Sequence, residues 1–201
     1  MGVIIHGNKN FGFAPINDNG DNTFSFGTPV MIPGLYSMTI EVSQEDTNIF
    51  ADDSVYCAVK GARVRTATAT LRNIPAAYLP YLGYLLQDNG GYADTGIFPS
   101  HCIFFETGSE NCADGSTTRR LHYLYNVRAS QPTQESQTDE DTVEAQNIEV
   151  NYTCTDSDIA VDDDGVKVQY FFIDRTDDTK NLFDTFETAV ILPTSEIPSA
   201  G

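Results

Sequence analysis

Hydrophobic and polar residues alternate along much of the chain with a period of two, which is typical of β-strands that bury one face. The alternation is clearest in residues 36–42, 120–129 and 148–154. Shorter stretches rich in β-branched and aromatic residues predict further strands, at Val3–His6, Val55–Lys60, Arg63–Leu71, Ile103–Phe105, Val166–Ile173 and Thr188–Leu192. Roughly nine strands separated by Gly-, Asp- and Asn-rich turns predict a mainly β fold, a two-sheet β-sandwich or barrel.

The same alternation assigns the inward faces of the three clearest strands. We expect these residues to point inward: Tyr36, Met38, Ile40 and Val42; Leu121, Tyr123, Tyr125 and Val127; and Ile148, Val150, Tyr152 and Cys154. Hydrophobic residues make up 40% of the chain, so a sizeable core is expected. We predict that residues 1–201 form a single domain with extended termini.

One segment has helical rather than strand periodicity. In residues 73–88, Asn73 suits the N-cap, Pro75 suits the first turn and Gly90-Gly91 suits the end. The helix-spaced apolar face consists of Ala76, Leu79, Leu82, Leu85 and Leu86. Pro80 lies inside this run and is expected to kink it. We predict one flanking α-helix at about 73–88.

Two polar segments are too long for simple turns. Residues 43–54 are acidic but carry Ile49 and Phe50 at their centre, and residues 130–141 contain no apolar residue except Pro132. Long loops of this kind are usually functional or disordered. We predict that an extended loop at about 43–54 contacts another chain through Ile49 and Phe50. The alternative is that both side chains fold back on their own domain.

The net charge is −18, from 29 acidic and 11 basic residues. Direct nucleic-acid binding needs Lys and Arg to neutralise phosphates, and anionic membranes attract basic segments, so this composition argues against both. No apolar stretch reaches the roughly 20 residues that a membrane-spanning helix needs. An acidic wall still lets DNA slide past without binding it. The alternative is that the charge only keeps the protein soluble.

Candidate catalytic and metal-binding residues are few. The three histidines are scattered, and neither Cys-x2-Cys nor His-x3-His spacing occurs. The acidic stretch 156–165 evokes a calcium loop, but with Gly165 at the sixth position Ala160 and Phe171 fall where carboxylates are required. Nucleotide-binding and hydrolase motifs are also missing. We expect no enzyme, no cofactor and no metal site, with weak cation binding and a carboxylate-based hydrolase as alternatives.

The cysteines are expected to be reduced. Residues 1–10 lack the charged start and apolar run of a signal peptide, so we expect synthesis in a cytosol, where disulfides are rare. The four cysteines are Cys57, Cys102, Cys112 and Cys154. Three of them lie within or beside apolar strand patterns, which is typical of small core residues.

Four stretches follow one another in a distinctive order and span most of the chain. They are Phe26–Gly34 leading into the strand Leu35–Val42; Ile49–Tyr56; Arg119–Asn126 followed by Arg128–Pro132 and Thr142–Gln146; and Asn181–Pro193. Together they resemble the major tail proteins of long-tailed phages, the subunits of the tail tube. Two features depart from that family. The closing segment has no Trp and carries Phe183 and Phe186 instead, and Pro80 interrupts the helix.

The resemblance implies two packed β-sheets with a flanking helix and a structural role in the virion. Such subunits join edge to edge into hexameric rings, and the rings stack into a tube through a long loop and the chain termini. A tape-measure protein fills the lumen during assembly, and tail terminator and distal tail proteins bind the two ends. Double-stranded DNA later passes through without specific binding. We therefore expect a virion tail component, made in the host cytoplasm, of a long non-contractile tail.

The resemblance also suggests two sets of contact residues. The ring-stacking interface is expected to comprise Glu45, Asp46, Ile49, Phe50, Asp52 and Asp53. Charge pairs between subunits are expected to join Arg63, Arg65, Arg119, Arg120 and Arg128 to acids such as Asp139, Glu140 and Asp141. The alternative for the arginines is cross-strand pairing within one subunit. The alternative function is a carbohydrate- or receptor-binding β-sandwich on a virion or cell surface, for which the ten tyrosines offer stacking platforms.

Overall fold

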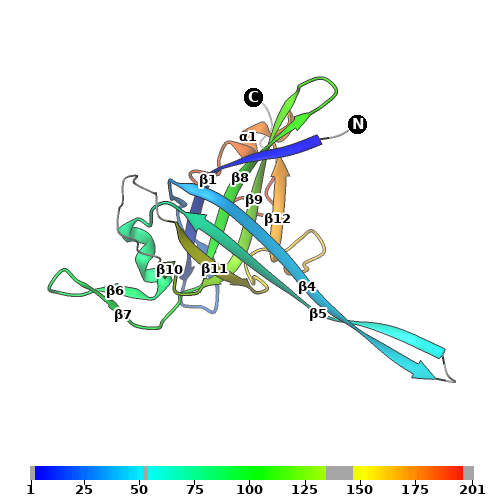
Figure 1. The fold of residues 1–201 in the computed structure, drawn as a ribbon, viewed down its shortest axis with the longest axis horizontal. Coiled ribbons are helices and arrows are strands. Elements are labelled where there is room, and N and C mark those ends of the chain that lie inside the picture. The colour runs from blue at the N-terminus through cyan, green and yellow to red at the C-terminus, as the bar shows by residue number, and fades with distance from the viewer. Residues whose placement is uncertain (1–2, 52–53, 135–146, 197–201) are drawn as a thin grey trace, which may run out of the picture.

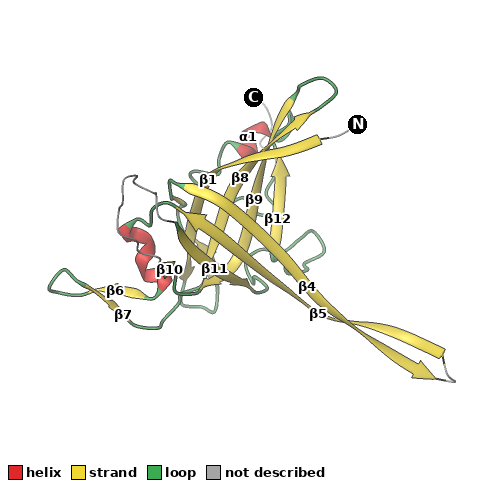
Figure 2. Cartoon of the chain, in the orientation of Figure 1, coloured by secondary structure: helices red, strands yellow, loops and turns green. Residues whose placement is uncertain are grey.

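The computed structural model describes residues 3–51, 54–134 and 147–196, without the side chains of residues 3, 50, 51, 55 and 134 (Figures 1 and 2). Its elements in chain order are β1 (Val3–Asp18), β2 (Phe24–Phe26), β3 (Val30–Met31), β4 (Leu35–Ala51), β5 (Ser54–Leu71), η1 (Ala76–Leu82), β6 (Tyr84–Leu86), β7 (Tyr92–Asp94), β8 (His101–Asn111), β9 (Thr117–Ala129), β10 (Thr133–Gln134), β11 (Ile148–Cys154), β12 (Tyr170–Asp174) and α1 (Lys180–Phe183). The prediction of a mainly β fold is confirmed.

Ten strands form one curled antiparallel sheet. The main path runs β2-β1-β8-β9-β11-β5-β4, while β3 pairs with β1, β10 with β11 and β12 with β9. Strands β6 and β7 form a separate two-stranded sheet. In the described residues β4 has no strand partner except β5, so the sheet does not close into a barrel.

Strand β9 lies at the centre of the sheet and is buried on both faces. Its pairing with β8 passes from Leu124 opposite Ile103 to Val127 opposite His101, so β9 carries one extra residue at this point. Such a β-bulge reverses which residues face which side. Val127 therefore points to the face opposite Leu121, Tyr123 and Tyr125, and the prediction that all four share one face is wrong.

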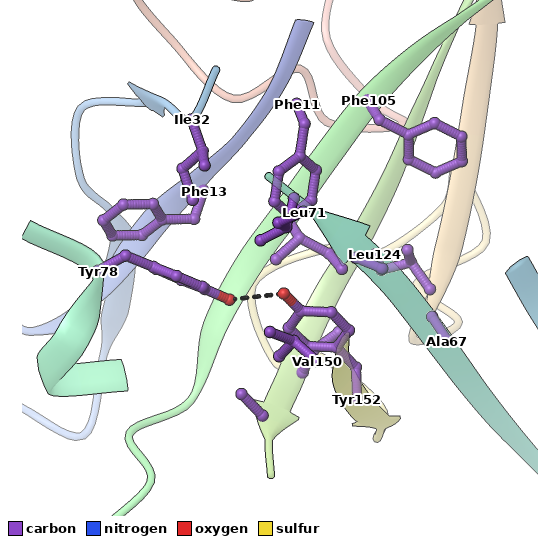
Figure 3. Close-up of a cluster of buried hydrophobic side chains, with 14 of the residues drawn as sticks. Phe11, Phe13, Ile32, Ala67, Leu71, Tyr78, Phe105, Leu124, Val150 and Tyr152 are labelled. Atoms are coloured by element: carbon purple, nitrogen blue, oxygen red, sulfur yellow. Dashed lines mark hydrogen bonds between the residues drawn. The ribbon is translucent and has the colours of Figure 1, made fainter. Parts of the chain in front are cut away.

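The concave face of the sheet encloses the larger core (Figure 3). Its buried residues come from β1, β5, β8, β9, β11 and η1 and from Ile32 just after β3: Phe11, Phe13, Ile32, Ala67, Ala69, Leu71, Tyr78, Leu82, Ile103, Phe105, Leu124, Val127, Ala129, Val150, Tyr152 and Cys154. The Tyr78 hydroxyl lies 3.0 Å from the Tyr152 hydroxyl and 2.9 Å from Nε2 of the buried His101. Nδ1 of His101 donates to the Pro99 carbonyl at 3.0 Å, so the polar atoms of this core are satisfied.

The opposite face of the sheet is covered by the C-terminal segment. Phe183 at the end of α1, Phe186 and Ile191 pack with Ala160 and Ile173. Their partners on the sheet are Ala14, Cys102, Phe104, Leu121, Tyr123 and Tyr125. The prediction of a strand at Thr188–Leu192 is wrong: this part of the chain forms turns that press Ile191 onto the sheet, and the Tyr125 hydroxyl donates to the Ile191 carbonyl at 2.6 Å.

The predicted α-helix at 73–88 is also wrong. The segment forms only the 3-10 helix η1, which has Pro80 inside it and ends at Gly83 with φ of 87°. Proline removes the backbone donor that an α-helix needs and clashes with the preceding turn. Leu85 and Leu86, expected on the helix face, instead lie in β6, and the turn containing Gly90-Gly91 joins β6 to β7.

The remaining strand predictions differ mainly in their bounds. Residues 148–154 coincide with β11, and their predicted inward face is confirmed. The two strands expected at 55–60 and 63–71 form the single strand β5. The strand predicted at Val166–Ile173 begins later than expected, because β12 starts at Tyr170. In β4, Met38 and Ile40 pack on the core as predicted, while Tyr36 and Val42 are exposed.

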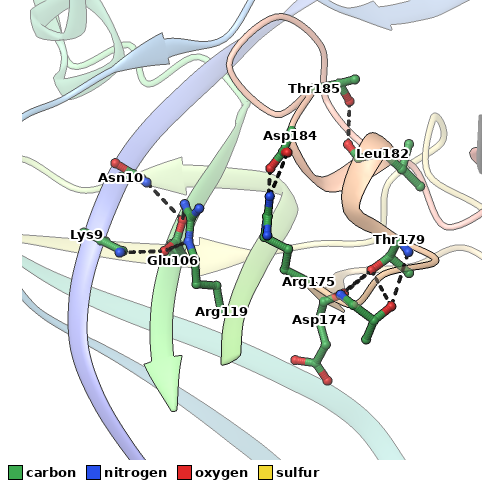
Figure 4. Close-up of polar contacts among 11 residues, drawn as sticks. Lys9, Asn10, Glu106, Arg119, Asp174, Arg175, Thr179, Leu182, Asp184 and Thr185 are labelled. Atoms are coloured by element: carbon green, nitrogen blue, oxygen red, sulfur yellow. Dashed lines mark hydrogen bonds and ion pairs between the residues drawn. The ribbon is translucent and has the colours of Figure 1, made fainter. Parts of the chain in front are cut away.

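A buried carboxylate joins three strands of the sheet (Figure 4). Glu106 of β8 accepts hydrogen bonds from Arg119 of β9 and from Asn10 of β1, at 3.0 Å for Asn10, and lies 3.2 Å from Lys9 Nζ. Burial alone would raise the pKa of Glu106, but the bonds from Arg119, Asn10 and Lys9 outweigh it and hold the pKa below its usual value. Asn10 has φ of 52° at a bulge in β1, which directs its amide to this carboxylate.

Replacing Glu106 by Gln is expected to lower the free energy of unfolding by about 2–3 kcal/mol, since it leaves Arg119 without its buried partner. Asp174→Asn is the matched control, because its pair with Arg120 is more than one third exposed and is worth less than about 1 kcal/mol. Chemical denaturation of both variants at neutral pH measures the difference. Equal losses would contradict the structural importance of the buried network.

The buried histidines predict a loss of stability in mild acid. Burial lowers the pKa of His101 to about 4, whereas the unfolded chain has the ordinary value of 6.5. Between pH 6.5 and 4, His101 therefore binds a proton in the unfolded state but not in the folded state. The free energy of unfolding falls as the pH is lowered through this window. The expected slope is about 1.4 kcal/mol per pH unit for each such histidine.

Unfolding free energies measured from pH 7.5 to 4.5 test this expectation. His101→Gln is expected to flatten the slope, and the exposed His6 supplies the control variant His6→Gln, which should leave the slope unchanged. A wild-type slope that survives in His101→Gln would assign the pH dependence to other groups.

Candidate assembly interfaces

Strands β4 and β5 continue beyond the body of the sheet as a two-stranded arm, defined here as residues 43–51 and 54–64 (Figure 1). Strand β11 pairs with β5 only from Leu71 to Arg65, so in the arm each strand has the other as its sole described partner. Backbone pairing extends to Ala51 and Ser54. The predicted loop at 43–54 is therefore wrong up to residue 51, because the two strands satisfy each other's backbone groups while the acidic side chains stay in solvent.

One face of the arm is apolar and exposed. Ile49 pairs with Cys57, Thr47 with Val59 and Ser43 with Val64, which places these side chains on one side of the hairpin. Ile49 is 48% exposed and Val59 is 47% exposed. Apolar surface left open on a projecting element is typical of a contact with another molecule.

The predicted stacking residues lie on or next to this arm. Glu45, Asp46 and Ile49 are exposed residues of β4 within the arm. Phe50 pairs its backbone with Val55. Asp52 and Asp53 lie outside the described residues, and the stacking role of all six stays a prediction.

A second apolar surface, the end groove, lies at the opposite end of the long axis from the arm (Figure 1). The groove has a volume of about 420 Å³ and is lined by Asn73, Ile74, Leu79, Tyr84, Tyr92, Pro132 and Ile148. The adjoining strand β6 exposes Leu85 by 54% and Leu86 by 58%. The sequence pattern missed this surface because Leu85 and Leu86 match helical spacing with Leu82, and the Gly90-Gly91 turn was read as a helix end rather than a hairpin turn.

The sheet also ends in an open edge at β4. In the described residues, β4 pairs with β5 on one side and with no strand on the other. Strand β1 has a second open edge at Val3–Asn10, because β2 and β3 pair only with residues 16–18 and 12–13 of β1. Unpaired strand edges are templates for pairing with another chain.

Two of the predicted arginines have carboxylate partners in their own subunit. Arg119 binds Glu106, and Arg120 binds Asp174 in bidentate fashion at 2.6 and 2.8 Å. The hydrogen bond from Arg120 to Asp174 raises the pKa of this guanidinium. These contacts match the alternative of cross-strand pairing, and a role of Arg119 and Arg120 between subunits stays untested.

The other three arginines are placed differently. Arg65 is 9% exposed and its guanidinium lies 4.5 Å from the centre of the Tyr170 ring, while burial lowers its pKa. Its Nε finds no hydrogen-bond partner in the described part of the chain. Arg63 is exposed on the arm, and the exposed Arg128 donates to Ser100 Oγ at 3.1 Å. The acids proposed as their partners, at 139–141, lie outside the described residues.

Chemistry beyond association finds no support in the described residues. Within residues 3–51, 54–134 and 147–196, no three His, Cys, Asp or Glu side chains are grouped to hold a metal ion. In the acidic stretch, Asp162 Oδ1 accepts hydrogen bonds from the backbone of Asp164 and Val166, and Asp158 pairs with Lys167. None of the helices described here has the length and apolar character required to cross a bilayer. The exposed arm, the end groove and the open edges are therefore the candidate functional surfaces.

Comparison with known proteins relates the chain to a family and to solved structures. A family model described as "Phage tail tube protein" matches residues 2–200, nearly the whole chain. Among solved structures, the chain is similar to a chain of the "Cryo-EM Structure of an Extracellular Contractile Injection System, PVC sheath-tube complex in extended state", with 10% sequence identity and a TM-score of 0.45 over 82% of this chain and 88% of that chain. None of the curated proteins matches the chain.

The arm predicts a separation of folding from association. Ile49→Asp is expected to change the free energy of unfolding of the isolated subunit by no more than about 0.5 kcal/mol, because the side chain is half exposed on a two-stranded element. The same variant is expected to weaken self-association measured by sedimentation velocity. Thr66→Asp, on an exposed position of β5 in the body, controls for the added charge. Large destabilisation by Ile49→Asp would instead support packing of Ile49 against its own subunit.

Proposed function

This chain belongs to the phage tail tube protein family and is a structural component of the virion tail, and we propose that six copies close into a ring and that the rings stack into the tail tube. The number six follows from the resemblance of the sequence to major tail proteins. In this role the subunit associates with other copies of itself, and no substrate or cofactor takes part.

The observation that carries this proposal is the open outer edge of β4. Residues 35–44 of this strand contain no Pro, Lys or Arg and only one charge, Glu41. Edge strands of soluble monomers are usually blunted by such residues, because an open edge invites uncontrolled pairing. We propose that β4 of one subunit pairs with the open edge of β1 in the next. Such a head-to-tail contact makes a closed ring when its rotation closes.

Stacking is assigned to the arm. It projects from the sheet and offers half-exposed Ile49 and Val59, and in the described residues its two strands pair only with each other. Burial of this surface on ring stacking removes apolar area from water, which favours association. The proposed stacking residues are those expected from the sequence, of which Glu45, Asp46, Ile49 and Phe50 belong to β4.

The acidic composition suits a channel for DNA. A net charge of −18 gives phosphates few binding partners, so double-stranded DNA passes without specific binding. We further propose that a tape-measure protein fills the lumen during assembly and that tail terminator and distal tail proteins bind the tube ends.

The alternative of a carbohydrate- or receptor-binding module has weaker support. Four tyrosines, Tyr78, Tyr123, Tyr125 and Tyr152, are buried in the two cores. The most exposed ones, Tyr36, Tyr56 and Tyr92, are dispersed over the start of β4, the arm and β7. Stacking platforms for sugars require several aromatic rings in one concave patch, which these residues do not form.

Negative-stain electron microscopy of the concentrated protein tests the proposal. We expect hollow rings and tubes with six-fold end views. Thr39→Lys is expected to reduce ring formation, because a lysine on the edge strand opposes pairing with another chain. Thr66→Lys is the matched control, since Thr66 lies on β5 between β4 and β11 and its strand edges are occupied.

Two results would contradict the proposal. Persistent monomers at high concentration, with or without preformed tube ends as templates, would remove the basis for a self-assembling subunit. Equal ring formation by Thr39→Lys and Thr66→Lys would show that the β4 edge is not the contact between neighbours.

A further inference from the structure

We propose that the arm of one copy docks in the end groove of a second copy. The proposal rests on the proposed function and deepens it, because it names the receiving surface of the stacking contact. The occupant of the groove is the apolar face of the arm that carries Ile49, Cys57 and Val59.

The first support is the placement of the two surfaces. The arm ends at one extreme of the long axis, and η1 and the β6–β7 hairpin, which line the end groove, lie at the other (Figure 1). A subunit therefore does not reach its own groove with its own arm. Two copies displaced along this axis in the same orientation bring arm and groove together, and the contact repeats without limit, as a tube requires.

The second support is that both surfaces expose apolar side chains. The groove is lined by Ile74, Leu79 and Ile148 together with two tyrosine side chains, and it is flanked by the exposed Leu85 and Leu86. The arm offers a row of half-exposed aliphatic side chains on one face of a two-stranded hairpin. Contact between the two surfaces removes apolar area of both from water.

The exposed Cys57 on the apolar face of the arm provides a direct test. Cys102 and Cys154 are buried, so Cys112→Ser leaves Cys57 as the one exposed cysteine. In that background Asn73→Cys adds a second thiol at the groove, and Leu86→Cys adds one beside it as an independent position. Assembled protein is treated with a short bismaleimide and analysed on a denaturing gel, with melting curves to verify that each variant is folded.

A ladder of covalent trimers and higher multimers is expected for Asn73→Cys and for Leu86→Cys. A ladder requires that Cys57 of each copy reaches the groove of another, whereas contact between two arms stops at dimers. The ladder should disappear when Cys57→Ser is added. Asp163→Cys, in an exposed turn away from the groove, is the control for nonspecific coupling and should give no ladder.

The outcomes separate this inference from the proposed function. Rings and tubes that form without a ladder, or with an equal ladder in Asp163→Cys, would overturn the arm-and-groove contact and leave the tube intact. A ladder limited to dimers would place arms against arms. Absence of rings and tubes under all conditions would overturn the proposed assembly and this contact together.

Discussion

The structure depends on the requirement that its central strand satisfies both edges and both faces at once. Strand β9 pairs with β8 along one edge. Along the other edge it pairs with β12, from Arg120 to Leu124, and with β11, from Val127 to Ala129. Between these two stretches the bulge turns Val127 and Ala129 to the larger core, while Tyr123 and Tyr125 face the other core. With a regular β9, Val127 and Ala129 would lie on the opposite face.

The arm projects because β11 and β12 share one edge of β9. Because β12 occupies the edge of β9 next to Tyr123, β11 pairs with β9 only beyond that point, and it ends at Cys154 opposite Arg65 of β5. From that point β5 no longer pairs with β11, but it stays paired with β4 as far as Ser54. The arm is thus the continuation of two body strands after their third partner ends, and its base is held by the sheet rather than by a flexible connection.

The hydrophobic pattern of the sequence predicted those features of the fold that depend on residues close together in the chain. Residues 148–154 alternate without interruption, and both their strand bounds and their inward face could be predicted. The apolar spacing of residues 73–88 predicts an α-helix that Pro80 prevents. The face of Val127 could not be predicted, because a bulge leaves no mark in the alternation. The acids of residues 43–54 are typical of a loop, and the local pattern does not show that these residues pair with β5. The partners of Glu106 lie 13 and 96 residues away, beyond the reach of any local rule.

The acidity of the chain restricts where copies can touch. At physiological ionic strength charges are screened over about 8 Å, so repulsion between copies is decided by the charges at the contact and less by the total of −18. The surfaces assigned to assembly carry a small share of this charge. Residues 35–44 of the β4 edge contain one acid, and residues 43–64 contain four acids and two basic residues. Backbone pairing and apolar burial act there without a large electrostatic cost. The remaining acids are then free to face solvent or a lumen, where their repulsion of phosphates is useful and does not oppose assembly.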